Sequence, residues 1–319
     1  MSTRIDPLND LDSLNASLDQ AIMIASTFDA NVKDQISHVL PADELTSLLY
    51  QEWYTRSGEE KSDTPLPQDH WAEVFRAAHQ GTYRWESGWR ASRVSTVGRV
   101  IAIRDEEERV LYPGDYISLD RPGLPPVPGT KIEAVSRRDS TSEQPGFWIA
   151  YSSTWENITK PILRLYFNIS PEGAVRLATQ ISEKLADDIP YCLKLPVDSA
   201  GYQRADTAVL YFEGNHFERL RTELHVIYAE LKRFLHPEVP ALTKKLEPGF
   251  GLAEDPPEDS ESFGLHRCRL IAEGFLAAKR SDGHDFTTMR ATIINHFLEV
   301  GIDLARPHLN PGTVNDYDW

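Results

Sequence analysis

The chain has 319 residues, of which 40% are hydrophobic, and its formal net charge is -16 at pH 7. This length and hydrophobic content suffice for a buried core and predict about two domains. The acidic balance argues against a general nucleic-acid-binding protein, because such proteins need a basic surface to contact phosphates. No run approaches the roughly 20 apolar residues of a membrane helix. The N-terminus also lacks the charged and apolar regions of a secretion signal, so we expect a cytoplasmic protein without a membrane partner.

The acidic side chains are unevenly distributed. Residues 1–80 hold 14 acidic and 5 basic residues, whereas residues 161–245 hold 11 of each. An acidic exterior around a locally cationic pocket would accept an anionic group on a peptide and reject nucleic acid. The alternative is that the acidic residues only keep the protein in solution.

The first part of the chain has a helical pattern. Apolar residues recur at helical spacing between residues 10 and 57, and Pro41 divides this stretch into two helices. A third helix runs through Trp71 and Ala78. We therefore predict a helical N-terminal region over residues 1–85.

From residue 88 the pattern changes to strands. Predicted strands cover Val94–Ile103, Ile117–Leu119, Ile132–Val135 and Phe147–Ser152, and Asp105–Glu108 is a predicted turn. Three more strands, at 162–168, 191–195 and 204–212, alternate with helices that begin near Ser170, Asn215, Ser262 and Phe286. We predict an α+β fold in which residues 86–319 form a mixed or antiparallel sheet with helices packed on it.

The three later strands carry polar residues in apolar surroundings. In the first of them, Arg164, Tyr166 and Asn168 share one face because strand side chains alternate. The second strand contains Lys194, and the third contains Arg204 and Tyr211. A cation within an apolar strand is costly to bury unless it meets an anion. That anion is either a carboxylate of the protein or a phosphate of a substrate.

The sequence lacks familiar catalytic spacings. It has no metal-ligand spacing among its ten histidines, no Walker loop and neither Gly-x-Gly-x-x-Gly nor Gly-x-Ser-x-Gly. The two cysteines, Cys192 and Cys268, lie in apolar contexts that favour reduced core thiols. We therefore expect neither a metal nor another cofactor.

The remaining candidates are the cations Arg164, Lys194, Arg204 and Arg267, together with the predicted helix start at Ser262-Phe263-Gly264. Arginine makes forked contacts with phosphate, and a helix N-terminus favours an anion. A lysine among other cations loses proton affinity, so Lys194 is suited to act as a general base near neutral pH. This set suits β-elimination of phosphate from phosphoserine or phosphothreonine.

Structural roles remain open for the cations. Arg204 and Asp206 share a strand face and can pair with each other. Arg164 can pair with an acidic group on a neighbouring helix, and Lys194 can extend into solvent from its strand end.

The tyrosines also have a structural alternative. Tyr166 and Tyr211 are typical of core tyrosines that make one hydrogen bond. On a continuous strand Tyr211 points away from Arg204, so a bulge is needed to bring both into one site.

Five segments form a recognisable set: Arg164-Leu-Tyr-Phe-Asn168, Pro190-Tyr-Cys-Leu-Lys194, Arg204-Ala-Asp-Thr-Ala-Val-Leu-Tyr211-Phe212, Gly249-Phe-Gly-Leu-Ala-Glu-Asp-Pro256 and Ser262-Phe-Gly-Leu-His-Arg267. Together they resemble the Hrp-outer-protein-A (HopA-type) family over about residues 160–280. That family includes type III effectors and proteins encoded with ribosomally made, modified peptides such as class V lanthipeptides and thioamitides. The resemblance implies that a separate kinase phosphorylates Ser or Thr of a precursor peptide. The lyase then eliminates phosphate to leave dehydroalanine or dehydrobutyrine.

The family's chemistry resembles that of the phosphothreonine lyase effectors, in which a lysine is the base, a histidine is the acid and arginines bind phosphate. By order along the chain, the resemblance assigns Lys194 as the base and Arg204 and Arg267 as phosphate ligands.

The acid departs from this pattern, because the corresponding strand reads Arg164-Leu165-Tyr166 and has no histidine. Tyr166 is the first candidate for the acid, followed by His266 and His216. The predicted phosphate and substrate ligands are Arg164, Asn168, Arg204, Tyr211, Ser262, His266 and Arg267.

The first 150 residues are expected to contact a leader peptide or the kinase. The alternative function is a non-catalytic, effector-like protein-interaction module, which the missing histidine favours. Residues 1–20 hold three serines and a helical pattern, unlike the serine-rich, disordered start that is typical of type III effectors.

Overall fold

The computed structural model describes residues 7–35, 41–56, 70–79, 83–152, 154–155, 158–185, 189–257, 261–281, 285–314 and 317–319. Its helices are α1 (Pro7–Gln35), α2 (Ala42–Leu49), α3 (Trp71–Ala78), α4 (Pro171–Lys184), α5 (Phe217–Leu231), α6 (Phe263–Arg280) and α7 (Phe286–Glu299). A π-helical turn, η1 (Tyr50–Tyr54), continues α2, and short 3-10 turns are η3 (Ala200–Gln203), η4 (Gly214–His216) and η5 (Lys232–Phe234).

The strands are β1 (Tyr83–Val94), β2 (Val100–Arg104), β3 (Glu107–Leu111), β4 (Tyr116–Ser118), β5 (Lys131–Arg137), β6 (Asp139–Ser140), β7 (Phe147–Tyr151), β8 (Ile162–Phe167), β9 (Tyr191–Pro196), β10 (Ala208–Glu213), β11 (Lys244–Glu247) and β12 (Phe250–Glu254). They form a five-stranded sheet in the order β3-β2-β1-β5-β4 and a seven-stranded sheet in the order β11-β12-β8-β10-β9-β7-β6. The strand pairs are antiparallel in both sheets, so the predicted α+β fold is confirmed.

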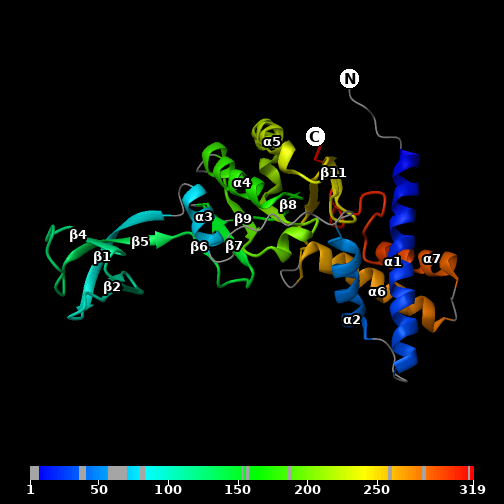
Figure 1. Cartoon of the computed structure of the whole chain (residues 1–319), viewed down its shortest axis with the longest axis horizontal. Coiled ribbons are helices and arrows are strands. Elements are labelled where there is room, and N and C mark those ends of the chain that lie inside the picture. Colours follow the sequence, from blue (N-terminus) through cyan, green and yellow to red (C-terminus); the bar gives the residue numbers. More distant parts are fainter. Residues whose placement is uncertain are drawn as a thin grey trace.

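The five-stranded sheet forms a β module, residues 83–137, that projects from the rest of the molecule (Figure 1). Its small core is centred on Trp89, which is fully buried. The guanidinium groups of Arg104 and Arg109 each lie 4.6 Å from the Trp89 ring centroid, and both pair with Glu86. These cations over an aromatic ring cover a core that a single thin sheet would otherwise leave open.

The predicted strand Val94–Ile103 is wrong, because a hairpin turn interrupts it. The backbone N–H of Ser95 donates to Arg99, and Gly98 has a φ of +78°. A glycine tolerates this left-handed conformation, which a β-branched residue resists. The predicted turn after β2 is present but shorter than expected, since β3 already begins at Glu107.

One face of the seven-stranded sheet is apolar and packs against α3, α4 and α5. Leu165 on β8 and Leu210 on β10 point to this face and are fully buried beside Leu177 of α4 and Leu224 of α5. Each such side chain contributes about 1.5–3 kcal/mol through its removal from water. Side chains alternate along a strand, so the same strands must present their polar residues to the opposite face.

The opposite face of this sheet is covered by α2, η1 and α6, with α1 and α7 packed behind them (Figure 1). The predicted caps of α4 and α6 are confirmed, because Ser170 and Ser262 each accept a hydrogen bond from the backbone N–H three residues later. The last predicted strand is shorter than expected. It begins at Ala208, and Arg204 lies in the turn before it.

Within the described ranges, no helix combines the length and the apolar character that a membrane crossing requires.

Candidate functional site

The polar residues of three neighbouring strands lie on the face of the seven-stranded sheet that α2, η1 and α6 cover. Tyr211 on β10 lies opposite Arg164 on β8 and opposite Cys192 on β9. One step along the sheet, Val209 separates Tyr166 from Lys194 in the same way. Directly opposed residues point to one face, so these side chains share a surface, as predicted for Arg164 and Tyr166.

Lys194 is the least neutralised cation of this surface. Its ammonium nitrogen lies 3.9 Å from the ring centroid of Phe147. It makes no hydrogen bond or ion pair with any residue that the structure describes. Burial lowers the pKa of Lys194 to about 8; Asp206 opposes this shift, and Arg164 and Arg204 add to it. A substantial fraction of Lys194 is therefore a neutral amine at slightly alkaline pH.

Arg204 is paired with a carboxylate of the protein. Its Nε and Nη2 atoms donate to the two oxygens of Asp206, each over 2.8 Å. Nη2 also donates to the Tyr50 hydroxyl over 2.7 Å, and this hydroxyl lies 3.2 Å from Asp206 Oδ2. The structural alternative considered for Arg204 is thus confirmed. Because Arg204 precedes β10, it reaches the same face as Tyr211 without the bulge that a continuous strand would need.

Arg164 is also neutralised within the protein. Its guanidinium donates to Asp255, which directly follows β12. The expected acidic partner was on a neighbouring helix, so the pairing is present but its partner lies elsewhere. Its Cζ atom lies 5.0 Å from the centroid of the Tyr211 ring. Tyr211, Tyr166 and Asp255 hold the pKa of Arg164 well above its usual value despite its burial, so this group remains a cation.

Two tyrosine hydroxyls meet beside Arg164 in the interior. Tyr54 and Tyr166 are 1% and 2% exposed, and neither hydroxyl has a hydrogen-bond partner of ordinary geometry within the described residues. Burial raises the pKa of both hydroxyls. Tyr166 raises the pKa of Tyr54 further, whereas Arg164 and Tyr54 lower the pKa of Tyr166. Gly264 makes room for Tyr54, since a Cβ at this position would lie 2.3 Å from the tyrosine ring. Both hydroxyls therefore keep their protons and are available as donors.

Arg267 is already bound by the protein itself, which disfavours its predicted role as a phosphate ligand. It is fully buried on α6, where Nε donates to the carbonyl of Pro307 and Nη2 to that of Leu309, each over 2.9 Å. These contacts hold the C-terminal segment and leave no guanidinium surface in water. Burial lowers the pKa of Arg267 to about 10.

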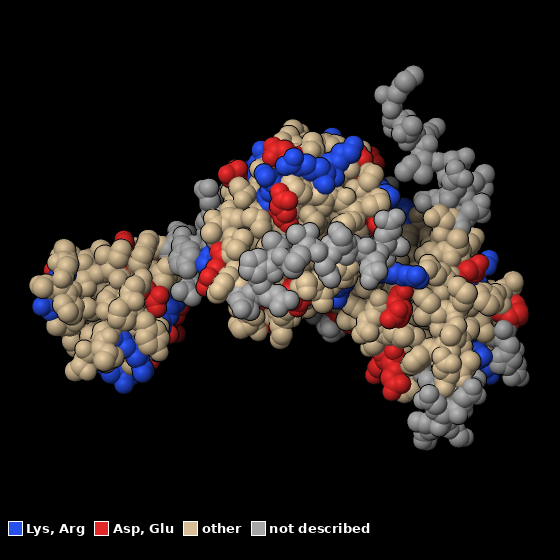
Figure 2. All heavy atoms as spheres, in the orientation of Figure 1, with Lys and Arg blue, Asp and Glu red and all other residues tan. Residues whose placement is uncertain are grey.

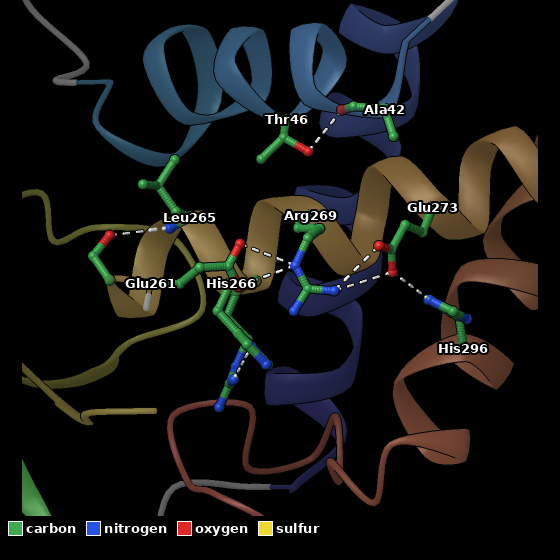
Figure 3. A network of polar contacts seen from close by, with 10 residues as sticks. Ala42, Thr46, Glu261, Leu265, His266, Arg269, Glu273 and His296 are labelled. Atoms are coloured by element: carbon green, nitrogen blue, oxygen red, sulfur yellow. Dashed lines mark hydrogen bonds and ion pairs between the residues drawn. The ribbon is translucent and has the colours of Figure 1, made fainter. Parts of the chain in front are cut away.

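The start of α6 is occupied by its own polar contacts (Figure 3). Ser262 caps the helix through the N–H of Leu265, and Arg269 pairs with both Glu261 and Glu273. His266 accepts a hydrogen bond from Arg267 over 2.7 Å, and burial together with the nearby arginines lowers its pKa to about 4. A neutral imidazole of this kind is a poor general acid, so the structure disfavours that role for His266.

Asn168 and His216 are engaged elsewhere. Asn168 is fully buried and its amide donates to the carbonyl of Glu238 over 3.0 Å, which disfavours its predicted role in substrate binding. His216 lies in η4 beyond the end of β10, with Nε2 3.7 Å from Glu213. It therefore lies outside the cluster formed by Lys194 and Arg164.

Tyr50 and Tyr54 are site residues that the sequence analysis missed. They are stacked with ring centroids 5.4 Å apart and come from η1, far from the sheet in sequence. Their spacing of four residues on a helix was the only local signal, and it does not tell which surface they cover. Among the residues that the structure describes, no group of three or more His, Cys, Asp or Glu side chains could hold a metal ion.

Comparisons with known proteins agree with one another. The model of the HopA1 effector protein family matches residues 138–309. The fold is similar to that of the effector protein from Pseudomonas syringae pv. syringae strain 61, with a TM-score of 0.52, 15% identity and coverage of 97% of this chain and 100% of the other. The effector protein from Pseudomonas syringae pv. tomato strain DC3000 gives a TM-score of 0.50, 17% identity and coverage of 92% and 99%. No curated protein matches the sequence significantly.

The Arg267 contacts predict a stability effect. Arg267→Met should lower the free energy of unfolding by roughly 2–4 kcal/mol, because two buried carbonyls lose their donors. Arg269→Met, which removes a half-buried ion-pair partner from the same helix, should cost less, on the order of 1 kcal/mol. Urea denaturation of both variants measures the difference, and equal losses would contradict the structural role of Arg267.

The Asp206 carboxylate predicts a change in Lys194. Asp206→Asn should lower the pKa of Lys194 below about 8, because the carboxylate that raises it is lost while Arg204 remains charged. The pKa is measured by NMR titration of the lysine Cε–Hε signal. Asp198→Asn, at an exposed position, is the matched control and should leave the value unchanged. An unchanged or higher pKa in Asp206→Asn would show that this carboxylate does not act on Lys194.

Proposed function

The chain belongs to the HopA1 effector protein family, and from this premise and the site geometry we propose that it is a phosphoserine or phosphothreonine lyase. Its substrate is a precursor peptide that a separate kinase has phosphorylated, and its product is dehydroalanine or dehydrobutyrine. The reaction belongs to the biosynthesis of ribosomally made, lanthipeptide-like peptides in the cytoplasm. The first 150 residues contact the leader part of this peptide or the kinase.

The observation that carries this proposal is the state of Lys194. A half-buried lysine with a pKa of about 8, which forms no ion pair with a described residue and feels only the nearby Asp206 carboxylate, is a base at working pH. An ordinary surface lysine has a pKa near 10.4 and holds its proton too firmly for this role.

The proposed step breaks two bonds of the substrate. The neutral Lys194 amine takes the Cα proton, the electron pair of that bond forms the Cα=Cβ double bond, and the bond between Cβ and the phosphate oxygen breaks. The leaving phosphate carries away the second electron pair. The Tyr166 hydroxyl, whose pKa is raised by burial, is the proposed proton donor to the bridging oxygen.

Arg164 and Arg204 are the proposed phosphate ligands, with a rearrangement. Each is paired with its own carboxylate, Asp255 or Asp206. Arg267 is bound to a backbone carbonyl, so Lys194, Arg204 and Arg267 do not form an open phosphate pocket in this structure. A phosphate dianion accepts charge-assisted, forked hydrogen bonds and carries more charge than a carboxylate. The Arg204 side chain is 32% exposed, so an entering phosphate meets it first and displaces Asp206.

A non-catalytic interaction module is the second candidate function. It is favoured by the same two ion pairs, because arginines that are already neutralised serve the fold without a substrate. The solved structures of similar fold are described as effector proteins.

Elimination predicts the loss of phosphoric acid from a peptide. The purified protein is incubated with a synthetic phosphothreonine or phosphoserine peptide, and mass spectrometry follows the loss of phosphoric acid. Lys194→Ala should reduce the rate by about a hundredfold or more, since general base catalysis is lost. Lys245→Ala, at an exposed position on edge strand β11, is the matched control.

Two results of this assay decide between the candidates. An active wild type with an equally active Lys194→Ala variant removes Lys194 from the role of base. An inactive wild type, assayed with and without a partner kinase, favours the interaction module.

The pH dependence follows from the same lysine. The elimination rate should rise about tenfold per pH unit below the Lys194 pKa of about 8 and level off above it, because only the neutral amine accepts a proton. The phosphate is already a dianion in this range, with a second pKa near 6. A rate that is constant between roughly pH 6 and 9 contradicts a lysine base.

A further inference from the structure

The outer face of the β module carries cations and apolar residues in alternation. Trp89 and Ala102 point into the small core of the module, so their neighbours Arg90 and Ile103 point outward. The cross-strand pairs extend this surface over four strands. The outer patch is defined as Arg90, Arg93, Ile101, Ile103, Val110 and Lys131.

The apolar part of the outer patch is accessible to water. Ile103 and Val110 are 40% and 47% exposed, and Ile101 between them lies directly opposite Val110. The module as a whole holds many of the exposed large hydrophobic side chains of the described residues: Trp85, Val97, Ile103, Val110, Tyr112, Ile117, Leu119, Leu124 and Val127. Such a concentration on one projecting element is typical of an interaction surface.

Two cations of the patch are direct neighbours across the strands. Arg90 on β1 lies directly opposite Lys131 on β5, and like charges in this position repel. In the part of the chain that the structure describes, the side chains of Arg90, Arg93 and Lys131 form no ion pair. By contrast, Arg104 on the inner side is paired with Glu86. A carboxylate bound between Arg90 and Lys131 would relieve the repulsion.

We propose that the outer patch binds an acidic amphipathic segment of a partner polypeptide. Carboxylates of this segment meet Arg90, Arg93 and Lys131, and its apolar side chains cover Ile103 and Val110. Charge complementarity supports this occupant: residues 83–137 hold 9 Lys or Arg and 8 Asp or Glu, within a chain of net charge -16. The module is thus close to neutral within an acidic chain, so it repels an acidic partner less than the chain as a whole does, and basic side chains are visible on it in Figure 2.

The borders of the patch distinguish a peptide from a nucleic acid. Glu108 on β3 lies opposite Ile103 on β2, and Glu133 lies two residues after Lys131 on the outer face of β5. A peptide places its carboxylates at intervals and its apolar residues between them, so it fits around these two glutamates. A phosphate backbone carries charge at every nucleotide and would meet both glutamates. This inference does not depend on the proposed elimination.

Fluorescence anisotropy of the full chain tests the proposal. The probe is a short fluorescein-labelled peptide that combines glutamates and leucines in an amphipathic order. The comparison probes replace its glutamates by lysine, replace its leucines by serine, or substitute a single-stranded DNA of similar charge. The glutamate–leucine peptide should bind more tightly than each of these. The Arg90→Glu, Lys131→Glu double variant should weaken its binding about tenfold or more, because two attractive charges become repulsive.

A matched double charge reversal provides the control. Arg176→Glu, Lys232→Glu changes two exposed cations outside the module and should leave peptide binding unchanged. Circular dichroism and the thermal midpoint show whether each variant is folded. Equal binding by wild type and the module variant, an equal loss in the control variant, or preference for the DNA would each overturn the proposal.

Discussion

The cost of removing a cation from water shapes the centre of this molecule. The seven-stranded sheet is covered on both faces, so a cation beneath the helices at its centre must find an anion or change its protonation. Arg164 and Arg204 take the first course, with Asp255 and Asp206. Lys194 takes the second, because burial and the two neighbouring guanidinium groups make its neutral form accessible. The same constraint thus produces both the structural ion pairs and the lowered pKa of Lys194.

The C-terminal segment is bound by the same principle. Glu254, at the end of β12, is fully buried and accepts hydrogen bonds from the N–H of Asn310 and from the hydroxyls of Thr313 and Tyr317. Arg267 binds carbonyls of the same segment from α6. Two buried charges of opposite sign therefore hold one irregular stretch of chain. Each guanidinium nitrogen of Arg267 and each carboxylate oxygen of Glu254 makes a hydrogen bond. Asp255, the partner of Arg164, comes directly after Glu254, so the contacts that fix Glu254 also fix the place of Asp255.

The sequence was informative where a short period decides the outcome. Strand alternation placed Arg164 and Tyr166 on one face, and the serine caps located the starts of α4 and α6. Helical period would also have placed Arg267 in the buried stripe, since it lies four residues from both Phe263 and Ile271. The strand boundary before β10 was missed, although Gly201, Ala205 and Asp206 are residues that strands disfavour. The approach of Tyr50 to Arg204 depends on how a distant helix packs, and no local pattern encodes it.

Tyr50 and Tyr54 lie in η1, outside the region that the family model matches. The matched region, residues 138–309, contains Lys194, Arg164 and Arg204 but neither tyrosine. A fragment cut to those limits would retain these three cations while losing the hydroxyl that bridges Arg204 and Asp206 and the Tyr54 ring, which packs in the same buried cluster as Tyr166. The polar cluster of the sheet face is therefore completed by residues outside the matched region, and the helical beginning of the chain belongs to it.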